Sequence, residues 1–292
     1  MGWVVTAVGA ALVLMALRDI FHTIWHPTGR GGLSRRLMAG VWRIGRSRRA
    51  LGPLVGPLAM VVVVLAWVLL ILLGSALVYW PHLPGGFVFG SSLDPTSRAG
   101  FLDAVYLSTV TLATLGFGDI VPAADWLRIA VPVQALVGFG LLTAAVSWVL
   151  QVYPALTRRR ALAVRLSLLR RVGTLGLVAD PRSAMAAPLL KDLAVELAQL
   201  RVDLTQYAET YYFRDGDPET SLPAMLGVAL HLSEHARRTA GVDARYAGEL
   251  LGAAVEDYLQ VVDEHFLHVG GPARAIASAY AEDHGQELAR AR

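Results

Sequence analysis

Three apolar runs constrain the fold of this chain more than any other feature, because each is long enough to cross a lipid bilayer. They extend from about Trp3 to Trp25, from Val55 to Trp80 and from about Trp126 to Tyr153. A hydrocarbon core about 30 Å thick needs about 20 helical residues. The first run has neither a basic segment before its apolar part nor a convincing small-residue cleavage site after it. We therefore expect a retained helix rather than a signal peptide.

The composition indicates a membrane part followed by a water-soluble part. Of the 292 residues, 55% are hydrophobic and 17% are charged, whereas soluble domains carry about a quarter charged residues. The apolar surplus ends near Tyr153-Pro154. We predict an all-α membrane protein with three transmembrane helices and a cytosolic helical domain. The predicted segments are 1–26 (N-terminal transmembrane helix), 27–52 (basic cytoplasmic or interfacial segment), 53–152 (membrane module) and 153–292 (cytosolic domain).

The placement of arginines predicts the orientation. Lys191 is the only lysine, and the arginines cluster at 30–49 and 158–171, beside the apolar runs. Cytoplasmic loops of membrane proteins carry the excess of basic residues, so both clusters are predicted to be cytoplasmic. The N-terminus is then outside and the C-terminal domain is in the cytoplasm, at a plasma or inner cell membrane. No nucleic-acid partner is predicted.

Within the basic segment, apolar residues recur at helical spacing with arginines between them. The apolar positions are Leu33, Leu37, Val41 and Ile44. The pattern is typical of a helix in the membrane interface, with its apolar face in lipid and its arginines at the headgroups. The alternative is an ordinary basic loop.

The segment between the second and third apolar runs is too polar and too rich in glycine to span a membrane. Backbone at membrane depth must be buried in protein or line water, so residues 99–122 are either extracellular or re-entrant. Ala99–Ala113 has helical periodicity and leads into Thr114-Leu115-Gly116-Phe117-Gly118-Asp119. A short helix followed by a strand with alternate glycines suits a filter lined by carbonyl oxygens, because Gly116 and Gly118 adopt backbone angles that other residues avoid. The alternative is an extracellular hairpin.

The sequence Thr111-x-x-Thr114-Leu115-Gly116-Phe117-Gly118-Asp119 resembles the signature of the pore-loop potassium channels. Residues 138–145 are similar to the inner helix of the small bacterial two-helix members, so 53–152 resembles their pore module. The resemblance implies a homotetramer in membrane lipid that passes K⁺ down its gradient, with no cofactor. It implies ion binding at Thr114, Leu115, Gly116 and Phe117, with Gly118, Asp119, Thr111, Tyr106 and Val110 as supporting residues. Leu115 and Phe117 are expected to pack behind the filter. Gating is expected through the inner helix and the cytosolic domain.

Two other functions remain open from the sequence. One is a weakly selective cation channel, and the other is a membrane anchor for a helical signalling domain. The intact Gly116-Phe117-Gly118-Asp119 argues against both. No span has arginine at every third position, so no voltage sensor of the usual kind is predicted.

The sequence departs from the family pattern at three places. Val110 stands where many bacterial members have a glutamate behind the filter, and Tyr106 stands where a tryptophan is frequent. We expect the Tyr106 hydroxyl to bond Asp119. Ala135 occupies the usual hinge position, so a hinge is expected at Gly138 and Gly140, or these glycines serve close helix packing.

Residues on one face of the third helix recur every four positions. They are Ala135, Phe139, Thr143, Ser147 and Gln151. The last three are polar in an apolar span, so Phe139, Thr143, Ser147 and Gln151 are predicted to line the pore. The alternative is hydrogen bonding between helices.

Several ionisable residues have two interpretations. Arg18, Asp19, His22 and His26 lie near the end of the first helix, where snorkelling and local Arg18–Asp19 compensation compete with a metal or proton site. His231 and His235 stand one turn apart and could bind a divalent metal, or they are surface residues. The chain has no cysteine and no Ser/His/Asp or phosphate-loop arrangement, so it is not expected to be an enzyme.

The cytosolic part is predicted to be a helical bundle. The candidate helices are 155–172, 182–213, 222–240, 243–268 and 272–290. Buried positions at heptad-like spacing include Leu193, Leu197, Leu200 and Leu204.

Overall fold

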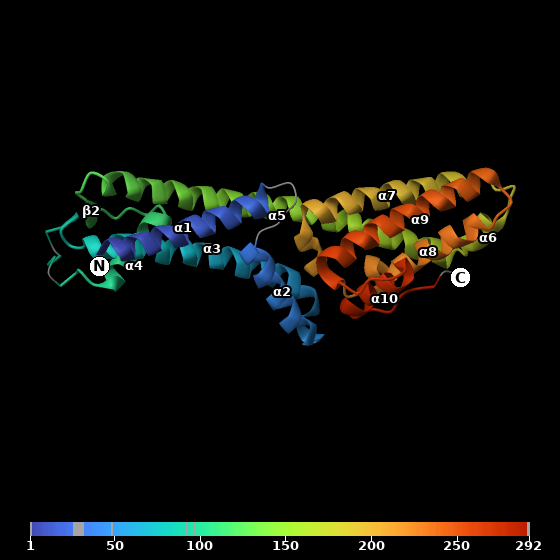
Figure 1. The fold of residues 1–292 in the computed structure, drawn as a ribbon, viewed down its shortest axis with the longest axis horizontal. Coiled ribbons are helices and arrows are strands. Elements are labelled where there is room, and N and C mark those ends of the chain that lie inside the picture. Colours follow the sequence, from blue (N-terminus) through green and yellow to red (C-terminus); the bar gives the residue numbers. More distant parts are fainter. Residues whose placement is uncertain (1, 26–31, 48, 92, 96, 291–292) are drawn as a thin grey trace. The chain divides into compact units, whose positions relative to one another are not determined.

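The computed structural model describes residues 2–25, 32–47, 49–91, 93–95 and 97–290 (Figure 1). The predicted boundary at residues 26 and 27, and His26 itself, lie outside these ranges. Three helices are long and apolar enough to cross a membrane, Gly2–Ile24, Gly52–His82 and Leu127–Arg171, and an all-α membrane protein is confirmed. By internal contacts the chain forms two units, residues 1–37 with 60–150 and residues 38–59 with 151–292.

In the first unit, α1 (Gly2–Ile24) crosses α3 (Val55–Tyr79) at a pair of glycines. A Cβ atom at Gly9 would lie 2.4 Å from the carbonyl oxygen of Gly74, and one at Gly74 would lie 2.8 Å from that of Gly9. Membrane helices gain their mutual attraction mainly from such close backbone packing, since lipid tails are as apolar as leucine. The two glycines therefore fix where α1 docks on α3.

A small core forms at one end of this unit, around the short helix η2 (Trp80–His82) and α4 (Phe101–Leu112). The strands β1 (Phe87–Phe89) and β2 (Ile120–Pro122) pair antiparallel, with Phe87 opposite Pro122 and Phe89 opposite Ile120. The buried residues are Ala76, Tyr79, Phe87, Ala104, Leu107, Ile120 and Leu127. This ladder joins the segment that precedes α4 to the segment that follows it.

The amphipathic pattern in the basic segment is a helix, α2 (Gly32–Ser47), followed by η1 (Arg49–Leu54). Its first turn is held by Asp19, whose carboxylate accepts hydrogen bonds from the backbone N–H groups of Leu33 (2.9 Å) and Ser34 (3.1 Å). The Ser34 hydroxyl and Trp67 Nε1 also donate to Asp19, the latter at 2.9 Å. Local compensation by Arg18 is therefore not what holds Asp19, because a buried carboxylate needs direct donors and these four supply them.

The third spanning helix is longer than predicted. A break was expected at Pro154, but α5 runs from Leu127 to Arg171. Proline removes one backbone hydrogen bond from a helix interior, and the flanking turns continue past this single loss. Buried Val152, Ala155 and Leu156 lie on both sides of Pro154, so packing maintains the helix there.

The second unit contains the predicted helical bundle. The helices α7 (Ala186–Gln206) and α8 (Leu222–Arg237) both pack along α9 (Val242–Val262), and α10 (Ala273–Asp283) packs on α8 and α9. The four heptad leucines of α7 are buried. The remaining elements are α6 (Thr174–Ala179), η3 (Ala208–Tyr212), η4 (Pro218–Thr220) and the π turn η5 (Asp263–Leu267).

Two predicted helices are too long, and one short helix was missed. The helix α7 ends at Gln206 rather than 213, because the carbonyl groups of Thr210 and Phe213 turn to the guanidinium of Arg159. The helix α10 ends at Asp283 rather than 290, close to Gly285 at φ +71°, a conformation that ends helices. The turn α6 occupies the predicted break at 173–181.

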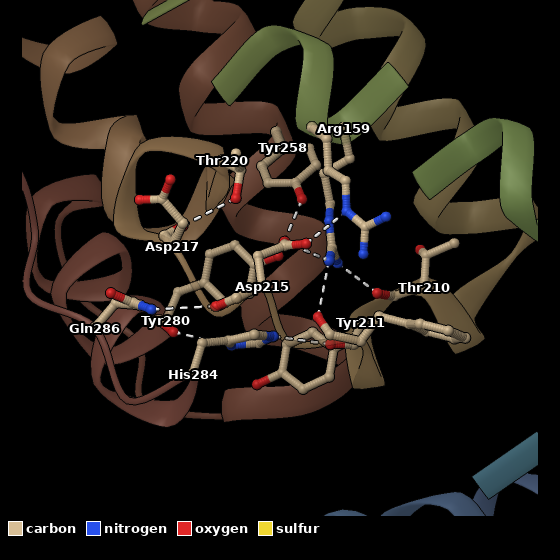
Figure 2. A network of polar contacts seen from close by, with 12 residues as sticks. Arg159, Thr210, Tyr211, Asp215, Asp217, Thr220, Tyr258, Tyr280, His284 and Gln286 are labelled. Atoms are coloured by element: carbon tan, nitrogen blue, oxygen red, sulfur yellow. Dashed lines mark hydrogen bonds and ion pairs between the residues drawn. The ribbon is translucent and has the colours of Figure 1, made fainter. Parts of the chain in front are cut away.

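A buried ion pair organises the interior of this unit (Figure 2). Arg159 Nη2 lies 3.0 Å from Asp215 Oδ2, with side chains only 5% and 3% exposed. The same guanidinium donates to the carbonyl oxygens of Thr210 and, at 2.8 Å, Phe213. The charge of Arg159 is thus compensated and hydrogen-bonded, as burial requires.

A second polar cluster ties α2 to α10 within this unit. Trp42 Nε1 donates to Asp283 Oδ2 at 2.9 Å, and the Tyr211 hydroxyl donates to the same oxygen at 2.6 Å. The Arg46 guanidinium pairs with the other carboxylate oxygen, and the ring of Trp42 lies 4.9 Å from that of His284. The second half of α2 is therefore bound to the bundle through the face that carries Trp42, a face that the apolar periodicity did not indicate.

His284 makes the stability of this cluster dependent on pH. Burial, together with the charge of Arg159, lowers the pKa of His284 from 6.5 to about 4. His284 therefore binds a proton more tightly in the unfolded chain than in the folded one. We expect the free energy of unfolding to fall by roughly 3 kcal/mol as the pH drops from about 6.5 to 4. Thermal unfolding of wild type and His284→Gln across this range would measure it. If the stability of His284→Gln fell as steeply with pH as that of the wild type, His284 would not be the group responsible.

Candidate functional site

The candidate site begins at the C-terminal end of α4, the helix predicted at 99–113. Gly100 caps its N-terminus, where the Gly100 N–H donates to the carboxylate of Asp103 at 3.1 Å. After Leu112 the chain turns out of the helix while keeping two bonds to it. The N–H of Thr114 donates to the carbonyl of Thr111 (3.0 Å), and the N–H of Leu115 donates to that of Val110 (2.9 Å). These bonds set the direction in which the following segment leaves α4.

Every second residue of that segment has a left-handed backbone. The φ angles are +58° at Thr114, +56° at Gly116 and +78° at Gly118. Glycine adopts such angles freely, and the sequence indicated them at both glycines. It did not indicate Thr114, where a β-branched residue with positive φ is a genuine outlier. Such strain is concentrated at functional sites, and the alternation is the one that a row of inward carbonyl groups needs.

The segment has no cover within its own chain. Residues 113–118 are all exposed, with Leu115 at 59% and Phe117 at 65%. The expectation that these two side chains pack behind the filter is therefore not met inside one chain. No packed surface of the described part of this chain faces them, so only another molecule can bury them.

The C-terminal end of the segment is fixed by Asp119. The Tyr106 hydroxyl donates to Asp119 Oδ2 at 2.7 Å, which confirms the hydrogen bond expected from the sequence. The Asp119 carbonyl accepts from the N–H of Gly90 at 2.8 Å, and β2 begins at the next residue. The supporting residues Val110 and Thr111 belong to the last turn of α4, and both are buried.

A buried polar network that the sequence reasoning missed holds α4 in place. Gln134 Nε2 donates to the hydroxyl (2.8 Å) and the carbonyl (3.1 Å) of Ser108, and its Oε1 accepts from the Tyr79 hydroxyl at 2.7 Å. The Ser108 hydroxyl donates to the carbonyl of Leu72 at 2.7 Å. This network joins α3, α4 and α5. Gln134 is a polar residue inside an apolar span, which is by itself a reason to suspect a role.

The predicted pore-lining stripe lies on the open side of α5. Phe139, Thr143 and Gln151 are exposed and Ser147 is half-buried. Val146 and Leu150, on neighbouring faces, are exposed as well. The exposure of these four residues is therefore compatible with pore lining. It does not distinguish them from residues on the neighbouring faces of α5.

The two hinge candidates differ in their surroundings. A Cβ atom at Gly138 would lie 2.1 Å from the carbonyl oxygen of Leu112, whereas one at Gly140 would meet nothing within 4 Å. The helix is continuous through both. Gly138 therefore serves the close packing of α5 on the end of α4, which is the alternative that the sequence left open.

This contact gives a matched pair of variants. Gly138→Ala should destabilise the membrane unit by about 1–3 kcal/mol, because the methyl group has no room beside a backbone atom. Gly140→Ala should be neutral or slightly stabilising, since alanine is the better helix former. Melting temperatures in detergent would compare the two. Equal melting temperatures for the two variants would show that the α4–α5 contact is not tight.

The two histidines of α8 do not gather a metal-binding set. His231 Nε2 lies 3.1 Å from Nη1 of Arg274. The Nη2 atom of the same guanidinium lies 3.0 Å from the carboxylate of Glu234. Among the described residues no group of three potential metal ligands is found. A guanidinium repels a cation, so this arrangement favours the surface-residue interpretation of His231 and His235.

Comparison with known proteins gives a family resemblance for part of the membrane module. Residues 60–153, about a third of the chain, match the sequence profile of a family described as "Ion channel". This part of the chain is therefore similar to ion channels. The match covers the second half of the membrane unit, including α4, the segment 113–118 and the first part of α5. The resemblance that the filter sequence indicated is confirmed, and the family is one of channels rather than enzymes.

Three curated proteins are similar to parts of the chain. The uncharacterized membrane protein YdjJ of Bacillus subtilis strain 168 is 25% identical over 171 residues, which are 57% of this chain and 49% of that protein. The two pore potassium channel c of Oryza sativa subsp. japonica is 40% identical over 86 residues, 28% of this chain and 18% of that protein. Protein LctB of Bacillus caldotenax is 39% identical over 83 residues, 26% of this chain and 60% of that protein. The aligned part is less than two thirds of each relative. No solved structure matches the chain.

Proposed function

We propose that this chain is one subunit of a homotetrameric, potassium-selective channel, with the filter at Thr114–Asp119. The observation that carries the proposal is the alternating left-handed backbone at Thr114, Gly116 and Gly118, in a segment that its own chain leaves uncovered. In this backbone successive carbonyl oxygens can face one axis and replace the water shell of a permeant ion. The match of residues 60–153 to ion channels supports this proposal.

The choice of ion rests on the filter sequence and on the named relative. Thr114, Leu115, Gly116 and Phe117 would supply the coordinating oxygens, and K⁺ would pass down its gradient without a cofactor. The rice protein that is 40% identical over 86 residues is called a potassium channel. A single filter segment cannot surround an ion, so several chains are needed, and the resemblance to pore-loop potassium channels implies four. In such an assembly Leu115 and Phe117 would be buried by a neighbouring subunit.

The proposed orientation follows from the arginines. The N-terminus would lie outside and the C-terminal domain in the cytoplasm, at the cell membrane. Phe139, Thr143, Ser147 and Gln151 would line the inner pore. Gating would act through α5 and the cytosolic domain.

Flux measurements test the proposal. Full-length protein in liposomes should pass K⁺ strongly in preference to Na⁺ and should be blocked by Ba²⁺, which has a double charge at nearly the same radius. Equal fluxes of Na⁺ and K⁺ would support the weakly selective channel instead, and no flux under any gradient would support the membrane anchor. Native mass spectrometry of the same protein should give a tetramer, and a monomer would overturn the assembly.

A further inference from the structure

A cavity of 320 Å³ lies between the end of α1 and the start of α2. Its lining comes from both helices and includes three charged residues: Met15, Arg18, Asp19 and His22 of α1, with Gly32, Leu33 and Arg36 of α2. Specific ligand sites in proteins usually begin at about this size. The ion-channel match begins at residue 60, so the family resemblance assigns nothing to this cavity.

The one carboxylate among the lining residues is already engaged. Asp19 is 6% exposed and accepts from the N–H groups of Leu33 and Ser34, from the Ser34 hydroxyl and from Trp67 Nε1. Three of these donors bond Oδ2 and one bonds Oδ1. Asp19 therefore secures the wall of the cavity and forms no ion pair with Arg18 or Arg36 in this structure.

The two arginines of the cavity have no acidic partner among the described residues. Salt bridges are formed by Arg46, Arg98, Arg158, Arg159, Arg160, Arg165, Arg170, Arg201, Arg237 and Arg274, and neither Arg18 nor Arg36 is among them. Both side chains are exposed. Two positive charges thus face one carboxylate that is already engaged, and the cavity carries an excess positive charge.

The surroundings place this charge near the membrane interface. Phe21 and Trp25, near the end of α1, are 52% and 61% exposed, and aromatic residues mark the headgroup level of membrane proteins. Arg18 is only about 10 Å from Trp25 along the helix at 1.5 Å per residue. The arginines of the amphipathic helix α2 lie at its exposed positions, as in helices that rest on anionic lipid.

We propose that this cavity binds the phosphate of an anionic phospholipid headgroup. The guanidinium groups of Arg18 and Arg36 would hold the phosphate oxygens, for which their planar donor geometry is suited. Met15 and Leu33 would contact the apolar part of the lipid next to the headgroup. Occupancy would join α1 to α2 through the ligand, in addition to the Asp19 contacts. The proposal depends on the membrane location and not on potassium selectivity.

Binding of short-chain lipids to the full-length protein in mild detergent tests this proposal. Dioctanoyl phosphatidylglycerol should bind in native mass spectrometry and raise the melting temperature, and dioctanoyl phosphatidylcholine should bind more weakly. Replacing Arg18 and Arg36 by glutamine should weaken phosphatidylglycerol binding by about tenfold for each lost charged contact. The matched control is Arg35→Gln, because Arg35 is exposed on the same turn of α2 but does not line the cavity.

The outcomes separate the alternatives. An equal loss in Arg35→Gln would show that general surface charge binds the lipid, and it would overturn the site. If inorganic phosphate at millimolar concentration gave the same stabilisation with the same dependence on Arg18 and Arg36, the ligand would be a free anion and not a lipid. Equal binding of both lipids to the wild-type protein would also refute the proposal, and that comparison needs no variant that folds.

Discussion

Gly116→Ala should abolish selective potassium flux while leaving the helices folded. The backbone at Gly116 has φ +56°, and a Cβ atom there would meet nothing within 4 Å. The obstacle is therefore the backbone conformation and not space. The left-handed conformation costs an alanine about 1–2 kcal/mol, and the cost recurs in every subunit of the proposed tetramer. The segment should relax to a conformation in which a carbonyl leaves the axis.

A flux assay with a matched glycine variant measures this effect. Gly85→Ala is the control, because Gly85 lies in a loop of the same unit, with nothing within 4 Å of an added Cβ and no positive φ. We expect Gly85→Ala to keep K⁺ flux and selectivity, and Gly116→Ala to lose one or both while the circular dichroism spectrum is retained. Unchanged selective flux in Gly116→Ala would show that residues 114–119 are not the filter.

Asp215→Ala should strongly destabilise the C-terminal helical bundle. It would leave the Arg159 guanidinium, 5% exposed, without the carboxylate that lies 3.0 Å away. Breaking a buried pair from one side typically costs about 3–5 kcal/mol. Amide hydrogen exchange in α8 and α9 should therefore become about two to four orders of magnitude faster, provided that these amides exchange through unfolding of the bundle.

Arg160→Ala provides the comparison for this prediction. Arg160 also contacts Asp215, at 2.6 Å, but its side chain is 47% exposed. Exposed ion pairs contribute about 0–1 kcal/mol, so exchange should change little. If the two variants had the same effect, the ion pair of Arg159 would not be what holds the segment 207–215 in place.

The features that could be predicted from the sequence are those encoded locally. The spanning helices follow from apolar length, α2 follows from its periodicity, and the left-handed backbone at Gly116 and Gly118 follows from glycine in an alternating pattern. The Tyr106–Asp119 bond could be expected because both residues belong to one short motif, 13 positions apart.

The features that were missed depend on residues that are distant in sequence. The bond from Trp67 to Asp19 joins residues 48 positions apart, that from Tyr79 to Gln134 joins residues 55 apart, and Arg159 meets Asp215 across 56. Each member looks ordinary alone, and only the tertiary fold brings the partners together. The end of α7 was overestimated for the same reason, because the Arg159 side chain takes the carbonyl groups of Thr210 and Phe213.

The two anchors of the segment 114–119 have a mechanical consequence. Near its N-terminal end, the Leu115 N–H donates to the carbonyl of Val110. At its C-terminal end, Asp119 accepts from the N–H of Gly90 and from the Tyr106 hydroxyl. A short strand clamped at both ends cannot slide along its own length, and it can only bow sideways. In the proposed channel, thermal motion would then change the width of the ring of oxygens at each level. The spacing between levels would be bounded by the reach of the chain, at most about 3.3–3.6 Å per residue.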